Sequence, residues 1–233
     1  MAISALNPTR IDLQNIAVGG LGTEAILDRH LEILSNGLPI AVQNTVENIK
    51  PESVISNLFG YASVINTNNT CGPASMASVM DYYGFGWNDV PIDSADGHYK
   101  NDPYVQRVMQ WSGAPDVLFG FLGTSPMRIV DTVNKLGLKA VWYGKSGFPN
   151  TLSHIKNEID NGRPVFVLLD WGQINQGHFI LDWQVAFAHD NAGIVCKISS
   201  GRNHWRKYDY ATFDKLMHNN IPNCDQTFIT VNK

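Results

Sequence analysis

A short, uninterrupted apolar run constrains the fold of this chain most strongly, the segment Pro164-Val165-Phe166-Val167-Leu168-Leu169. Its residues do not alternate with polar ones, which is typical of a strand that is covered on both faces. Such a strand needs another layer of structure on each side. It is also the longest apolar stretch, far below the roughly 20 residues that cross a bilayer, so we expect no membrane span.

Helical periodicity dominates the first part of the chain, and strand-like patterns dominate the second part. Helices are predicted at 23–36, 51–59, 71–83, 125–136, 151–160 and 210–218. Strands are predicted at 61–65, 138–143, 164–169, 178–186, 194–198 and 226–231, with a hairpin turn at 190–193. Helices first and most strands later favour the α+β class.

The domain organisation follows from length and from where the patterns sharpen. At roughly 150 residues per domain, 233 residues make about one and a half domains. We therefore expect one domain over residues 61–233, preceded by residues 1–60 as an N-terminal helical extension or a pro-segment. The N-terminus has neither a basic opening nor a sustained apolar run, so it does not resemble a secretory signal. We expect a cytoplasmic protein, or one exported by a leaderless route.

Composition disfavours several classes of function. Lys and Arg total 17 against 21 Asp and Glu, without the basic run that would neutralise phosphates, so we expect no nucleic-acid partner. Asp93, Asp96, His98 and Asp102 lack the spacing of a calcium loop, and we interpret them as a solvated loop. The three cysteines form no metal-binding pair and suit a reducing compartment or one functional thiol. No metal or organic cofactor is expected.

Cys71 is the candidate nucleophile, because it lies in the first turn of the helix predicted over 71–83. A thiol attacks as thiolate, and the free N–H groups of a helix N-terminus favour the anion. We expect Gly72 to let a substrate backbone come close, and the adjacent N–H to hold an oxyanion. Met76, Val79, Met80 and Tyr83 form the apolar stripe of the same helix.

The sequence around this cysteine resembles that of a known family. The segment Asn69-Thr70-Cys71-Gly72-Pro73-Ala74, running on to Tyr82-Tyr83-Gly84, is similar to the nucleophile helix of papain-like cysteine peptidases. Within them it most resembles the branch related to bacterial, bacteriocin-leader-processing peptidase domains. The resemblance covers roughly residues 61–215 and implies a papain-like fold, with a helical lobe packed on an antiparallel β lobe.

His178 completes the pair that this family uses. Gly162-Arg163-Pro164-Val165 leads through Trp171-Gly172 to Gly177-His178, as the family's strand, loop and Gly-His motif do. The resemblance implies that His178 is the general base and later the acid. Trp171, just before that loop, is core by default, with the wall of a substrate groove as its alternative.

Two positions depart from the family pattern. The usual Asp after the histidine strand would fall near Ser199, where no carboxylate exists, and Asn203 is the nearest residue able to orient an imidazole. Asp182 shares a face with His178 but is expected to lie too far along the strand. The usual Gln six residues before the nucleophile is Ile65, so Asn66, rather than Asn68, is expected to supply the oxyanion amide.

The sequence thus predicts a cysteine peptidase that hydrolyses a peptide or amide bond of a peptide or protein substrate through an acyl-enzyme. Its candidate residues are Cys71, His178, Asn203 and Asn66. A catalytically weak or inactive papain-like binding module is the alternative, because the two departures remove groups that the family uses. Another acyl donor also remains open, since Cys–His pairs serve acyltransferases and amidases.

Overall fold

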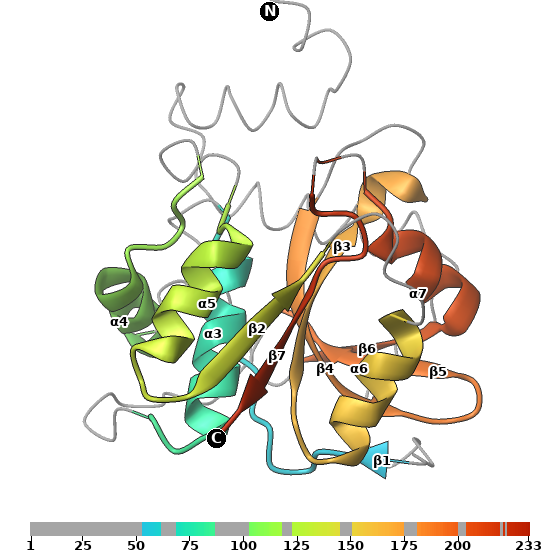
Figure 1. The fold of residues 1–233 in the computed structure, drawn as a ribbon, viewed down its shortest axis with the longest axis horizontal. Coiled ribbons are helices and arrows are strands. Elements are labelled where there is room, and N and C mark those ends of the chain that lie inside the picture. The colour runs from blue at the N-terminus through green and yellow to red at the C-terminus, as the bar shows by residue number, and fades with distance from the viewer. Residues whose placement is uncertain are drawn as a thin grey trace, which may run out of the picture.

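The structure of the chain is a computed structural model (Figure 1), which describes residues 53–61, 69–86, 103–117, 123–144, 151–174, 181–199, 204–219, 221 and 223–233. The helices are α3 (Cys71–Tyr82), α4 (Pro103–Ser112), α5 (Pro126–Asn134), α6 (Thr151–Asp160) and α7 (Tyr210–Met217), with a 3-10 turn, η2 (Trp171–Gln173). The strands are β1 (Ser53–Val54), β2 (Lys139–Tyr143), β3 (Val165–Asp170), β4 (Leu181–His189), β5 (Gly193–Lys197), β6 (Trp205–Asp209) and β7 (Phe228–Asn232).

The described strands form one antiparallel sheet in the order β2-β7-β3-β4-β5-β6, and β1 pairs with the far end of β4. Figure 1 shows α3, α4 and α5 on one side of this sheet and α6 and α7 on the other. All six residues of β3 are buried, so the prediction of a strand covered on both faces is confirmed. The predicted α+β class, with a helical layer packed on an antiparallel sheet, is confirmed as well.

Helix α3 is the most deeply buried helix of the described part. Its residues 72–80 are all buried, which is possible because most of them are small or apolar. The predicted stripe is confirmed at Met76, Val79 and Met80, whose side chains are fully buried. Tyr83 is only partly buried, and its hydroxyl donates to the carbonyl of Val231 in β7 at 2.6 Å.

Local sequence signals set the other predicted elements. Ser125 accepts a hydrogen bond from the backbone N–H of Arg128, as expected for the cap that precedes α5. Strand β2, helices α6 and α7, and strand β7 lie within two residues of their predicted ranges. The predicted hairpin is β4 and β5, which pair from Val185 with Lys197 to His189 with Ile194.

The helix predicted over 51–59 is wrong within its described residues. Ser53 and Val54 form β1 and pair with His189 and Ala188 of β4. Ile55 and Leu58, which follow this strand, join the main hydrophobic core. Pairing with the end of β4 therefore outweighs a local helix signal of only two turns.

Helix α4 and strand β6 were not predicted. In α4 only Tyr104, Val105 and Val108 supply a buried apolar face, and in β6 charged residues interrupt the alternation. The helix predicted at 23–36 and most of the strand at 61–65 lie outside the described residues. The pro-segment role of residues 1–60 stays a prediction.

Gly193 provides a test of the β5–β6 packing. A Cβ at this position would lie 2.0 Å from the carbonyl oxygen of Tyr208, which is backbone and cannot rotate away. We expect Gly193→Ala to lower the free energy of unfolding by about 2 to 3 kcal/mol, measured by chemical denaturation. Gly137→Ala is the control, because a Cβ there meets nothing within 4 Å and only its φ of +79° is unfavourable. An equal loss in the two variants would contradict the assigned packing.

Candidate active site

Cys71 is the first residue of α3, and its side chain is partly buried. The chain turns into the helix through Asn69, whose φ of 63° is in the left-handed region that Asn tolerates. Thr70 precedes the helix without a side-chain cap, so the first-turn N–H groups are not occupied by it. Sequence and structure therefore agree on a thiol at the open end of a helix.

The sulfur of Cys71 has three hydrogen-bond partners. The backbone N–H groups of Gly72 and Trp183 donate to it, and the side chain of Asp182 lies in hydrogen-bond contact with it. Gly72 belongs to α3, whereas Asp182 and Trp183 belong to the start of β4. The thiol therefore lies where the helix meets the sheet.

Two hydrogen bonds hold this junction together. Ser75, one turn into α3, donates its hydroxyl to the carbonyl of Trp183 at 2.9 Å. The indole N–H of Trp183 donates to the carbonyl of Thr124 at 2.8 Å, just before α5. Both bonds are buried, so β4 fixes the helix that carries the thiol and the loop beside it.

Burial raises the pKa of the Cys71 thiol to about 12, and the negative charge of Asp182 acts in the same direction. The N–H groups of Trp183 and Gly72 lower this pKa, but by less. We expected the helix N-terminus to favour the thiolate. In the structure, desolvation and a neighbouring carboxylate outweigh the N–H donors, which favours the neutral thiol over the thiolate.

Asp182 is the site residue to which sequence reasoning assigned no role. Its carboxylate is buried and accepts a hydrogen bond from the side-chain amide of Gln184 at 2.8 Å. Gln184 in turn accepts from the hydroxyl of Tyr208 at 2.9 Å. The signal was present, because Asp182 and Gln184 are polar residues on one face of an otherwise apolar strand.

Gly72 allows α3 to approach Thr124 closely. A Cβ at this position would lie 2.3 Å from the side-chain oxygen of Thr124. The missing side chain therefore makes room for Thr124. The expectation that Gly72 also lets a substrate backbone come close stays a prediction.

The other three candidate residues, His178, Asn203 and Asn66, lie outside the described residues. Their predicted roles stay predictions. Trp171 is fully buried against Tyr208, so its assignment to the core is confirmed. Cys196 is fully buried in β5.

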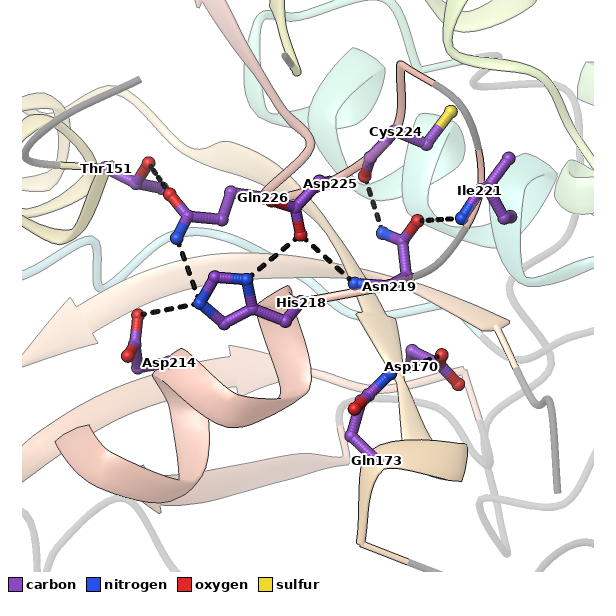
Figure 2. Close-up of polar contacts among 10 residues, drawn as sticks. All are labelled: Thr151, Asp170, Gln173, Asp214, His218, Asn219, Ile221, Cys224, Asp225 and Gln226. Carbon is purple, nitrogen blue, oxygen red and sulfur yellow. Dashed lines mark hydrogen bonds and ion pairs between the residues drawn. The ribbon is translucent and has the colours of Figure 1, made fainter. Parts of the chain in front are cut away.

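A second polar cluster lies at the end of α7 (Figure 2). Nδ1 of His218 is 3.0 Å from Asp225, and its Nε2 is 3.1 Å from the amide nitrogen of Gln226. Thr151 donates to Gln226 at 2.7 Å and so joins this cluster to the start of α6. No nucleophile of the described residues is bonded to His218, and the cluster serves to connect the two helices.

The chain belongs to a peptidase family. The Peptidase_C39 like family matches residues 36–215, which is well over half of the chain. This membership agrees with the papain-like fold predicted around Cys71. Comparison with curated proteins gave no match.

Three solved structures are similar to this chain. The peptidase domain of Streptococcus ComA, a bifunctional ABC transporter in a quorum-sensing pathway, is 15% identical over 75% of this chain and 98% of that one, with a TM-score of 0.46. A double glycine motif protease from an AMS/PCAT transporter, in complex with the leader peptide, is 14% identical over 78% and 99%, with a TM-score of 0.45. A putative C39-like peptidase from Bacillus anthracis is 14% identical over 78% and 97%, with a TM-score of 0.49.

Two searches of the described residues gave negative results. No helix there has the length and apolar character needed to span a bilayer. Likewise, the described His, Cys, Asp and Glu side chains form no group of three or more that could hold a metal ion.

The raised pKa of Cys71 predicts the pH dependence of its alkylation. Below the thiol pKa the thiolate fraction grows about tenfold per pH unit, and only the thiolate reacts with iodoacetamide. Without substrate, we expect the rate at Cys71 to rise in this way between pH 7 and pH 9, measured by peptide mapping. A rate already at its plateau at pH 6 would contradict the neutral thiol.

Proposed function

We propose that this protein is a cysteine peptidase that cleaves a peptide or protein substrate with Cys71 as nucleophile. The observation that carries the proposal is the position of this thiol. It lies at the first residue of a buried helix, with two backbone N–H groups directed at the sulfur, in a chain that belongs to a peptidase family. Those donors would stabilise negative charge on the sulfur when the thiolate forms.

In the proposed reaction, His178 removes the thiol proton as the sulfur attacks the substrate carbonyl. The S–C bond forms and the carbonyl oxygen becomes an oxyanion. Collapse of this intermediate breaks the C–N bond, and His178 passes the proton to the leaving amine. Water, deprotonated by His178, then hydrolyses the thioester and returns the thiol.

A base is essential in this scheme because the thiol pKa is about 12, so at neutral pH the thiol keeps its proton until the base takes it. Asn203 is proposed to orient the imidazole of His178, and Asn66 to donate its side-chain amide to the oxyanion. The backbone N–H of Gly72, already at the sulfur, is proposed as the second oxyanion donor.

The finer assignment to the bacteriocin-leader-processing branch is supported by the motif that runs from Cys71-Gly72-Pro73-Ala74 to Tyr82-Tyr83-Gly84. It would make the substrate a leader peptide. Cleavage before Tyr61 of a pro-segment is a separate proposal. Such cleavage would remove β1 together with Ile55 and Leu58, which are part of the core.

The alternative is a binding module that keeps the fold without catalysis. The raised thiol pKa is the observation that favours it, because a neutral thiol is a poor nucleophile. The two functions differ in one result. A binding module would retain peptides without cleaving them, and substitution of Cys71 would not change that retention.

Removal of His178 tests the peptidase directly. We expect His178→Ala to lower the rate of peptide cleavage at least 100-fold, because no other group then takes the thiol proton. Cys71→Ser is expected to bring cleavage to background. The measurement is mass spectrometry of a peptide library incubated with each variant.

His218→Ala is the matched control for this experiment. His218 is paired with a carboxylate, Asp225, and its cluster contains no described nucleophile. Cleavage by this variant should match the wild type. Full cleavage by His178→Ala, or equal losses in both histidine variants, would refute the assigned base.

Two nearby asparagines, Asn66 and Asn68, allow the proposed oxyanion donor to be compared with a matched control. We expect Asn66→Ala to lower kcat about 100-fold or more, with a much smaller change in KM, since the lost hydrogen bond forms in the transition state. Asn68→Ala should leave kcat unchanged. The proposal for Asn66 fails if the two variants have the same kcat.

A further inference from the structure

We propose that Asp182 is a further residue of the reaction site, whose buried carboxylate holds the Sγ proton of Cys71 and keeps the nucleophile neutral at rest. The proposal rests on the peptidase function proposed above and adds a residue to its chemistry. Starting the reaction then requires a base that draws this proton away from the carboxylate.

The geometry begins with the contact between the two side chains. The side chain of Asp182 is hydrogen-bonded to the Cys71 thiol, and because an ionised carboxylate only accepts, the S–H group is the donor. The Trp183 N–H, one residue further along β4, donates to the same sulfur. Thiol and carboxylate are therefore held by adjacent residues of one strand.

A buried polar chain fixes the orientation of this carboxylate. Gln184 donates its amide N–H to Asp182 at 2.8 Å, and Tyr208 in β6 donates its hydroxyl to Gln184 at 2.9 Å. All three side chains are buried, so an alternative orientation would leave polar groups without partners. The hydrogen bonds of this series all run in one direction, from Tyr208 to Gln184 and from Gln184 to Asp182.

Two buried titratable groups, Cys196 and Tyr208, respond to the charge of Asp182. Asp182 and Ala186 lie on the same face of β4. Ala186 pairs with Cys196, and Cys196 pairs with Arg206, so both residues lie on the same face of the sheet as Asp182. Burial raises the pKa of Cys196 and of Tyr208 well above their ordinary values, and the charge of Asp182 adds to both shifts. These two groups therefore stay neutral at working pH.

Arg206 is the cation that strand pairing puts on this face, and its guanidinium lies over the ring of Trp171 at 5.1 Å. It lowers the pKa of Tyr208. Lys197 and Lys207 alternate onto the opposite face of their strands. Among the described strand residues, Lys197 and Lys207 therefore do not share a face with Asp182, whose carboxylate contacts the thiol of Cys71.

This arrangement assigns Asp182 two effects on the proposed reaction. At rest it suppresses the thiolate. Once the proton moves from Sγ to the imidazole of His178, we expect the same carboxylate to stabilise the positive charge formed on that ring. No atom is gained or lost in this step, because the proton passes from sulfur to nitrogen.

The test compares alkylation of Cys71 by iodoacetamide in wild type, Asp182→Asn and Asp182→Glu. Without the charge, the thiol pKa falls, and we expect about tenfold or faster alkylation at pH 8 in Asp182→Asn. Asp182→Glu keeps the charge and should remain close to the wild type. Asp190→Asn is the matched control, because Asp190 is a buried carboxylate in the turn between β4 and β5 that binds Lys207 instead.

Cys196 provides an internal control in the same experiment. It is fully buried, so its alkylation reports unfolding. Faster labelling of Cys71 with Cys196 unlabelled supports the proposal. Unchanged or slower labelling of Cys71 in a folded Asp182→Asn protein overturns it.

If Asp182→Asn unfolds, infrared spectroscopy of the wild type tests whether Cys71 carries the hydrogen-bonded thiol proton. The proposal predicts an S–H stretching band at pH 7 that is absent from Cys71→Ser and lies below the frequency of a free thiol. Absence of a Cys71 S–H band at this pH overturns the proposal. Failure of peptide cleavage by the wild type, with both readings as predicted, would instead overturn the proposed function alone.

Discussion

The hydrogen bond from Ser75 to the carbonyl of Trp183 is the interaction on which the site depends. It fastens the first turns of α3 to the start of β4, and the indole of Trp183 extends the junction to Thr124. Gly72 permits this close packing because a side chain there would collide with Thr124. The same junction brings Cys71 and Asp182 into contact, so packing and chemistry share one set of residues.

Opposing electrostatic effects determine the state of the nucleophile. Backbone N–H groups favour a thiolate, whereas burial and the carboxylate of Asp182 disfavour it, and the second pair is stronger. A helix N-terminus is therefore not sufficient to ionise a partly buried cysteine next to a carboxylate. In the proposed reaction the helix supplies an oxyanion donor, and a base supplies the ionisation.

Patterns within single segments predicted most of the described fold. The apolar run of β3, the stripe of α3 and the cap at Ser125 each depend on local sequence, and each is confirmed. Strand β1 was missed because its two residues are held only by pairing with β4. Asp182 was considered only as a partner of His178, because its contact with Cys71 depends on a helix that is distant in the sequence.

The most direct test of this account is a crystal structure of the Cys71→Ser variant with a bound, uncleaved peptide. We expect an imidazole nitrogen of His178 within hydrogen-bond reach of the hydroxyl introduced by this substitution, with the carboxylate of Asp182 beside both. The scissile carbonyl should point toward the Gly72 N–H. An imidazole directed away from that hydroxyl, with the peptide bound elsewhere, would contradict the account.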